Sequence, residues 1–355
     1  MFRSVGLSPY RDWQDMLRFQ SKLLAGMKQL RGMHVPEYAN TPRELVYRED
    51  KLSLWHMRGE RQAVSKTPLL IVYALVNTVW MTDLQADRSL VRNLLAQGED
   101  VYLIDWGYPD GADRWLTLDD YLNTYLDHCV EVIRVRHGRH AIDLLGICQG
   151  GTFSLCYTAM HPEKVRHLVT MVTPVDFHAP DNMLSTWVQD VDVDLLVDTL
   201  GNVPAELMNW IYLMLKPARL LQQKYVHMVD MLDKPMELKN FLRMERWIFD
   251  SPDQAGEAFR QFLKDFYQGN KLIKGQLKLA GRGVDLAAVK QPVLNIYAEK
   301  DHLVPPAASR ALAQYVGSSD YTEQKFNGGH IGIYVSTRAQ REVAPSIHRW
   351  LRARS

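Results

Sequence analysis

The stretch "AIDLLGICQGGT", residues 141–152, decides the fold. An apolar run typical of a buried strand ends at Gly146, and small residues that can begin a helix follow Cys148. Strand, sharp turn and helix in this order form a nucleophile elbow, in which glycines two residues before and after the nucleophile prevent clashes. Taken alone, the motif fits a catalytic thiol and a small buried cysteine at a strand end equally well.

Composition narrows the class of protein. The chain has 355 residues, 46% of them hydrophobic and 23% charged, which is typical of a globular α/β domain with an insertion. The formal net charge of +1 gives no support for a nucleic-acid partner. The three cysteines show no CxxC spacing, so we expect neither a disulfide framework nor a metal site.

Targeting signals are not evident in the sequence. The start "MFRSVGLSPYRDWQD" has no apolar core of the kind found in secretory signals. The longest apolar run, at 69–76, is far shorter than the roughly 20 residues of a membrane helix. We therefore expect a cytoplasmic protein with no transmembrane segment.

Strand patterns alternate with helical patterns through most of the chain. A hairpin is expected from residue 44, and buried strand runs then precede helical stretches at 83–97, 118–136 and 149–160. The alternation resumes near the end, with strands at 292–299 and 320–326, a helix at 307–316 and a C-terminal helix. This rhythm predicts a mostly parallel sheet covered on both faces.

The chain divides into three regions. Residues 1–43 are expected to be a helical extension, with an amphipathic helix at 10–31 that either packs on the protein or binds a partner. The catalytic core is assigned to 44–175 and 286–355. Between these two parts, 176–285 is rich in aromatic residues and methionine at helical spacing, and it is expected to form a helical cap, or lid.

Two residues later in the chain support the interpretation of Cys148 as a catalytic nucleophile. Asp301 follows a predicted strand in "IYAEKDHLVPP", and His330 follows the next one in "FNGGHIGIYVS". The chain order nucleophile, acid, histidine is that of the α/β-hydrolase fold. His330 would take the thiol proton or pair with the thiolate, and Asp301 would orient His330 or stabilise its charged form.

The oxyanion of an acyl-transfer intermediate needs two N–H donors. One is expected from the backbone of Gln149, and the other from the loop after the first buried strand, at Val76 or Asn77. The side chains of Tyr73 and Asn77 are candidates for the pocket floor. His302 is either part of the site wall or a plain loop residue.

Sulfur in place of oxygen favours a particular reaction class. An acyl group on Cys148 is a thioester, energetically close to a CoA thioester, so exchange of acyl groups is favoured over hydrolysis. A cap at 176–285 would exclude water and hold an apolar acyl chain. A thioesterase or esterase with a cysteine nucleophile is the alternative, and a non-catalytic scaffold on this fold is a third interpretation.

From about residue 44 to the end, the chain closely resembles the catalytic (C-type) subunit of class III polyhydroxyalkanoate synthases, whereas residues 1–43 carry little of the resemblance. Class I synthases have a long additional N-terminal domain, so the length favours class III. The stretches that carry the resemblance are "LLIVYALVN", "MTDLQ", "DVYLIDWGYPD", "LLGICQGGTFSLCY", "LVTMVTPVDF", "KNFLRMERWIFDSPDQAGEAFRQFLKDFY", "DHLVPP" and "FNGGHIGIYVS".

The resemblance implies polymerisation of short-chain (R)-3-hydroxyacyl-CoA, chiefly 3-hydroxybutyryl-CoA, into a polyester with release of CoA. It implies a second, E-type subunit, an oligomeric assembly, a location at cytoplasmic polyester granules, and no cofactor beyond the CoA of the substrate. Carried onto this chain, it places the growing polymer on Cys148 and has His330 activate that thiol. It has Asp301 help to activate the incoming 3-hydroxyl group, which differs from a role in orienting His330 alone.

Overall fold

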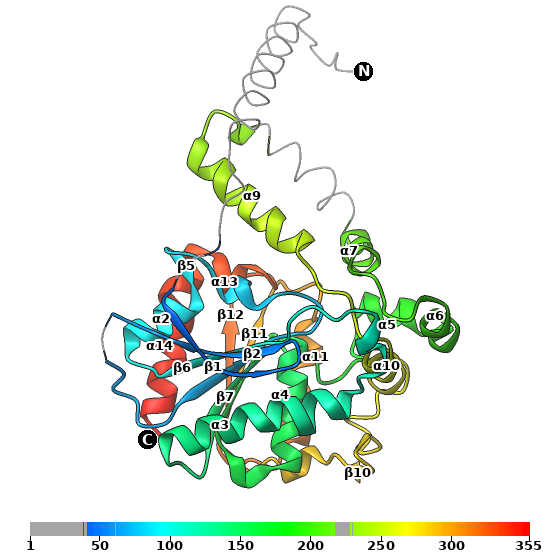
Figure 1. The fold of residues 1–355 in the computed structure, drawn as a ribbon, viewed down its shortest axis with the longest axis horizontal. Helices are drawn as coiled ribbons and strands as arrows, with labels where there is room; N and C mark the ends of the chain where they lie inside the picture. The colour runs from blue at the N-terminus through cyan, green and yellow to red at the C-terminus, as the bar shows by residue number, and fades with distance from the viewer. Residues whose placement is uncertain (1–37, 39–40, 61, 217–227, 229) are drawn as a thin grey trace, which may run out of the picture.

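The protein is described here by a computed structural model, which places residue 38, residues 41–60, 62–216, residue 228 and residues 230–355. The predicted helix at 10–31 lies outside these residues. A mixed eight-stranded sheet runs through the centre of the described part, in the order β1-β2-β6-β3-β7-β8-β11-β12 (Figure 1). The pairs β1·β2 and β2·β6 are antiparallel, and all the other pairs are parallel.

The strands of this sheet lie close to the predicted positions. Two short antiparallel pairs lie outside it: β4 (Asp83–Gln85) with β5 (Arg88–Ser89), and β9 (Lys278–Leu279) with β10 (Arg282–Gly283). The strands of the main sheet are β1 (Arg43–Glu49), β2 (Leu52–Met57), β3 (Leu69–Val72), β6 (Val101–Asp105), β7 (Ile142–Ile147), β8 (Val165–Met171), β11 (Val293–Ala298) and β12 (Tyr321–Phe326).

Helices cover both faces of the sheet, as the alternating pattern predicted. Figure 1 shows α2 and α14 on one side and α3 and α4 on the other. The core helices are α2 (Leu90–Gln97), α3 (Asp127–His137, preceded by a π-helical segment at Asp120–Leu126), α4 (Gln149–Met160), α11 (Pro306–Arg310), α12 (Leu312–Tyr315), α13 (Gly332–Val335) and α14 (Thr337–Arg352). Short 3₁₀ segments lie at Val79–Thr82, Gly111–Trp115, Pro162–Lys164 and Leu286–Ala288.

The hydrophobic core has two layers, because successive strand residues point to opposite faces. On β3, Leu70 and Val72 join the cluster under α3 and α4, whereas Leu69 and Ile71 join the cluster under α2 and α14. All four are fully buried, and each contributes roughly 1.5–3 kcal/mol by leaving water. Because both faces of β3 are packed, the position of its carboxyl end is fixed. The candidate site lies at that end.

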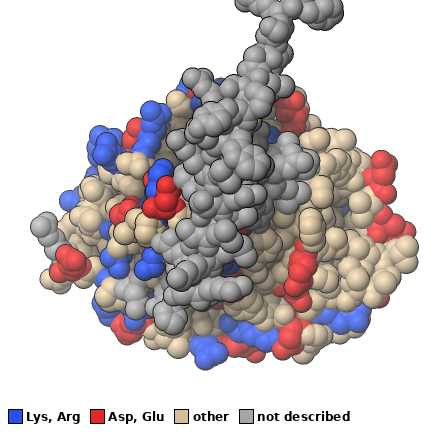
Figure 2. Space-filling model, turned by 90° about the horizontal axis from the view of Figure 1, so that it is seen from above, with Lys and Arg blue, Asp and Glu red and all other residues tan. Residues whose placement is uncertain are grey.

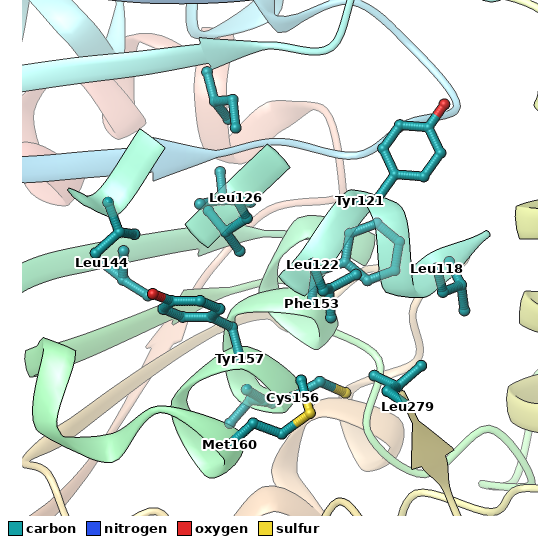
Figure 3. Packing of buried hydrophobic residues seen from close by; sticks show 14 of the residues in the cluster. Leu118, Tyr121, Leu122, Leu126, Leu144, Phe153, Cys156, Tyr157, Met160 and Leu279 are labelled. Carbon is teal, nitrogen blue, oxygen red and sulfur yellow. The ribbon is translucent and has the colours of Figure 1, made fainter. Parts of the chain in front are cut away.

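Figure 3 shows the layer under α3 and α4, where Cys156 lies among Tyr157, Met160 and Leu279. Cys156 and Cys129 are both fully buried free thiols. Both cysteines therefore pack in the core. Cys148 differs from both, since it is half-buried.

The predicted helix at 83–97 is wrong in its first half. Residues 83–89 form the β4–β5 pair, and α2 begins only at Leu90. Ser89 caps the helix by accepting a hydrogen bond from the Arg92 N–H at 2.9 Å, and its hydroxyl donates to the buried carboxylate of Asp83 at 2.5 Å. This local network favours a turn over the helical pattern that the apolar residues suggested.

Between β8 and β11 the described chain is mainly helical. The helices are α5 (Met183–Val188), α6 (Val193–Leu200), α7 (Ala205–Met214), α9 (Pro235–Phe249) and α10 (Gly256–Gln261), with a π-helical segment at Phe262–Gln268. The β9–β10 pair near its end is too short to leave a periodic signal in the sequence. Figure 1 shows α7 and α9 beyond one edge of the sheet. The boundaries of the three predicted regions stay a prediction.

On the face shown in Figure 2, acidic and basic side chains lie interspersed, with neutral residues between them. Within the described residues, no helix combines the length and apolar character needed to cross a bilayer.

Candidate active site

Cys148 lies in the sharp turn between β7 and α4. Its φ of 54° and ψ of −126° are strained for a residue with a side chain, and such strain costs about 1–3 kcal/mol. The Cys148 N–H donates to the Met171 carbonyl on β8 at 2.9 Å, which ties the turn to the sheet. Cys148 is also the N-cap residue of α4, so its side chain begins beside the first turn of that helix.

The glycines around Cys148 are required by space. A Cβ on Gly146 would lie 2.5 Å from the Gly151 Cα. On Gly150 it would lie 2.3 Å from the Val72 carbonyl oxygen at the end of β3, and on Gly151 it would lie 1.8 Å from the Thr173 hydroxyl. The elbow predicted from the sequence is thus a place where α4 approaches two strands at backbone distance.

Replacing Gly150 with alanine is expected to destabilise the protein by about 1–3 kcal/mol, the usual cost of forcing an atom into packed structure. The obstacle is the Val72 carbonyl, which cannot rotate away as a side chain could. Urea denaturation would measure the change in the free energy of unfolding. Gly111→Ala is the matched control, because a Cβ there meets nothing within 4 Å. Equal stability of the two variants would contradict the packing described here.

The structure brings Asp301 and His330 together behind Cys148. Asp301 follows β11, and His330 follows β12, so both lie past the carboxyl ends of neighbouring parallel strands. His330 Nδ1 donates to Asp301 Oδ2 at 2.7 Å, and the Asp301 side chain is only 1% exposed. The other carboxylate oxygen accepts the N–H groups of Leu303 and Val304, each at 2.9 Å.

The charge state of His330 follows from its neighbours. Burial lowers the pKa of the ring, but the charges of Asp301 and Cys148 and their hydrogen bonds to the ring outweigh it and raise that pKa from 6.5 to about 10. Since Nδ1 is bonded to Asp301, Nε2 is the atom left for Cys148. The arrangement therefore favours a charged imidazolium beside Cys148 at neutral pH.

The His330 ring is expected to stay protonated well above pH 6.5 and to lose its proton only in alkaline solution. Because the charge of Cys148 raises the pKa of His330, Cys148→Ala is expected to lower that pKa. The charge of Asp301 would still raise it. Nitrogen chemical shifts of labelled histidine, followed from pH 5 to 11, would measure both values. A ring that titrates identically in the two proteins would contradict the effect of Cys148 on the pKa of His330.

A cavity of about 170 Å³ lies in front of Cys148 and His330. The predicted pocket residues Tyr73, Asn77 and His302 all line it, and so does Val76. Helical residues between β8 and β11 form the opposite wall, where sequence reasoning named no individual contact. The wall residues that it missed are Asn209, Tyr212, Leu213, Leu215, Trp247 and Ile248.

The aromatic pattern between β8 and β11 did mark this segment, but it could not separate wall residues from core residues. Asn209 left no signal at all, because a single amide in a helix has no distinctive pattern. The side-chain amide oxygen of Asn209, Oδ1, accepts a hydrogen bond from the Ser251 hydroxyl at 3.2 Å.

Tyr73 and Tyr212 bring hydroxyl groups to this cavity. Burial raises the pKa of both hydroxyls, and the charge of Cys148 raises it further, so both are neutral donors.

The predicted oxyanion donors lie on two adjoining segments. Gln149 is the first residue of α4, and N–H groups of a first helical turn have no partner within the helix. Val76 lies in the loop after β3 and faces the same cavity as Cys148. The two segments are joined directly, because the Leu75 N–H donates to the Gln149 side-chain oxygen at 2.9 Å. Their role as an oxyanion hole stays a prediction.

Comparison with known proteins agrees with this geometry. The family described as "alpha/beta hydrolase fold" matches residues 67–337. A soluble variant of monoglyceride lipase from Saccharomyces cerevisiae superposes with a TM-score of 0.60 at 14% identity, covering 91% of this chain and 98% of that one. The likeness to the lipase concerns the fold alone, and the predicted α/β-hydrolase fold is confirmed.

Other proteins resemble this chain much more strongly in sequence. The poly(3-hydroxyalkanoate) polymerase subunit PhaC of Allochromatium vinosum is 59% identical over 352 residues, covering 99% of each chain. The protein of the same name from Synechocystis is 51% identical, covering 99% of this chain and 95% of that one.

The family described as the N-terminus of poly-beta-hydroxybutyrate polymerase (PhaC) matches residues 11–94. The expectation that residues 1–43 carry little of the resemblance is therefore wrong. With the resemblance itself confirmed over nearly the full length, the chain belongs to the poly(3-hydroxyalkanoate) polymerase PhaC family, built on the α/β-hydrolase fold.

Proposed function

We propose that the protein is an acyltransferase that polymerises short-chain (R)-3-hydroxyacyl-CoA, chiefly 3-hydroxybutyryl-CoA, with release of CoA. The observation that carries this proposal is the cysteine at the elbow, paired with His330 and Asp301 and facing a mostly apolar cavity. The names of the relatives support the same activity.

In the first half-reaction the Cys148 thiolate attacks the thioester carbonyl of the substrate. The carbonyl oxygen becomes an oxyanion held by the N–H groups of Gln149 and Val76. The bond from carbon to the CoA sulfur then breaks, and the leaving thiolate takes a proton from His330. The enzyme is left with an acyl-thioester on Cys148 and a neutral imidazole.

In the second half-reaction the 3-hydroxyl group of another unit attacks this thioester. His330 Nε2 takes the hydroxyl proton as the new carbon–oxygen bond forms, and the bond from carbon to the Cys148 sulfur breaks. The ion pair of thiolate and imidazolium is thereby restored. One ester bond is gained for each CoA released.

The two half-reactions place different demands on Asp301. An alcohol is a far weaker acid than a thiol, so the hydroxyl attack needs a strong, well-oriented base, whereas a preformed thiolate needs none. The contact of 2.7 Å from Asp301 to His330 supports activation of the hydroxyl through His330, since both carboxylate oxygens already have partners. Asp301 then has one role that serves both purposes: it orients the His330 ring, and through the ring it assists the attack of the hydroxyl group.

The size and lining of the cavity support a short acyl group. About 170 Å³ is below the roughly 300–1,000 Å³ of pockets that hold drug-sized ligands. Residues 176–285 are proposed to act as a cap, because α7 and α9 supply Asn209, Tyr212, Trp247 and Ile248 to its wall. Such a wall keeps water away from the acyl-thioester, which would otherwise be hydrolysed.

The assembly and location of the protein belong to the proposal as well. We place it in class III, working with a second, E-type subunit in an oligomer at the surface of cytoplasmic polyester granules. No cofactor enters either half-reaction, since every proton and acyl transfer above uses a side chain of this chain.

The test is incubation with 3-hydroxybutyryl-CoA, with and without the second subunit, followed by assays for free CoA, polymer and free acid. Release of CoA together with polymer is the expected result. Free 3-hydroxybutyrate as the only product would instead identify a thioesterase with a cysteine nucleophile.

A further inference from the structure

The loop after β3, residues 73–78, carries Val76 and is held by side chains from several elements. On the core side, the Trp106 indole N–H donates to the Tyr73 carbonyl at 2.9 Å. Gln149 accepts the Leu75 N–H at 2.9 Å, as described above. These two contacts fix the beginning of the loop against the residue that follows β6 and against the elbow.

Two further contacts come from the segment between β8 and β11. The Gln254 side-chain amide donates to the Leu75 carbonyl at 3.0 Å, and the Trp247 indole N–H on α9 donates to the Thr78 carbonyl at 3.0 Å. Both side chains are buried, at 5% and 4% exposure. Leu75 is thus held from both sides, with its N–H bonded to the elbow and its carbonyl bonded to the proposed cap.

Gln254 is itself fixed to the proposed cap. Its amide also donates to the Pro252 carbonyl at 3.1 Å, so both of its side-chain hydrogens are used. Its backbone pairs with Val203, with the N–H of each residue donating to the carbonyl of the other at 2.9 Å. Val203 lies in the link between α6 and α7. A displacement of this link or of α9 would therefore pull directly on residues 75 and 78.

We propose that Gln254 and Trp247 are positioning residues that hold the Val76 N–H in the oxyanion hole, so that the hole is complete only while the cap is seated. This inference rests on the proposed function. The Leu75 carbonyl and the Val76 N–H belong to one planar, trans peptide group, so a contact that holds the carbonyl also fixes the direction of the N–H. An opening of the cap to admit substrate would release the loop, and its return would restore the oxyanion donor.

Gln254→Met is the informative variant, because it keeps the length of the side chain and removes its donor. We expect kcat for CoA release to fall about 10- to 100-fold, since oxyanion donors are worth 10²–10³-fold and here the donor is misplaced, not deleted. KM should change less than about twofold, because Gln254 is not among the described residues that line the cavity. Trp247→Phe should act in the same direction.

A second readout separates positioning from folding. Alkylation of Cys148 by iodoacetamide proceeds through a transition state with no oxyanion, so its rate reports the thiolate and its accessibility alone. The alkylation rate of Gln254→Met should equal that of the unmodified protein. Gln261→Met is the matched control, because the Gln261 amide oxygen accepts the Leu118 N–H at 2.7 Å, away from the loop, and it should retain kcat.

An unchanged kcat in Gln254→Met would overturn the proposal, and so would equal losses of acyl transfer and alkylation. Equal losses in Gln254→Met and Gln261→Met would also overturn it, since they would mark a general effect of losing a buried hydrogen bond. A failure of the proposed function looks different: the unmodified protein would then release no CoA from 3-hydroxybutyryl-CoA, or Cys148→Ala would release it at the normal rate.

Discussion

Cys148→Ala is expected to lower the rate of CoA release from 3-hydroxybutyryl-CoA by on the order of 10⁴-fold or more, the usual consequence of removing a nucleophile from a triad. Covalent transfer is impossible without the sulfur, and the remaining donors around the cavity accelerate only slow background hydrolysis. A spectrophotometric assay of free thiol would measure the rate.

Cys156→Ala is the matched control for this variant. Cys156 is fully buried in the layer under α3 and α4, two turns into the helix that Cys148 begins. Its replacement should cost some stability but leave the rate of CoA release within a few-fold of normal. If the two variants were equally impaired, or if Cys148→Ala kept its activity, Cys148 would not be the nucleophile.

Asp301→Asn is expected to separate the two half-reactions. Chain growth should slow by roughly 10²–10³-fold, because His330 loses the partner that orients it and stabilises its charged form while it takes the hydroxyl proton. Formation of the first acyl-thioester should slow by less than about tenfold, because the thiolate attacks without a base and CoA is a good leaving group. Rapid quench with 3-hydroxybutyryl-CoA would resolve the burst of CoA from the steady rate.

His330→Gln is the companion variant, since it removes both the base and the cation that favours the thiolate. Both half-reactions should slow together in this variant. An Asp301→Asn protein that lost the burst and the steady rate in equal measure would show that Asp301 is needed for the first attack too. That outcome would contradict the proposal that the Cys148 thiolate attacks without a base.

The architecture could be predicted because each layer leaves a periodic signal. Buried runs such as 142–147 mark central parallel strands, and glycines at 146, 150 and 151 mark the close approach of α4. The order of Cys148, Asp301 and His330 then identified neighbours that lie far apart in the chain. Their contact follows from parallel strands ending at one edge, which is a rule of topology.

The rest could not be predicted because it depends on contacts between non-periodic segments. Nothing local marks Gln254 as a partner of Leu75, since the two are 179 residues apart and glutamine is common on surfaces. Trp247 fits a helical stripe whether it packs in a core or lines a cavity. The β4–β5 pair at 83–89 was missed because the network of Ser89 and Asp83 outweighs the apolar spacing.

The most direct test of a covalent chain on Cys148 is mass spectrometry of the protein quenched in acid after a brief exposure to 3-hydroxybutyryl-CoA. The account predicts a protein heavier by one or more hydroxybutyryl units, with the added mass on the peptide that contains Cys148 and absent in Cys148→Ala. Release of CoA with no adduct on that peptide, or with the adduct on another residue, would contradict it.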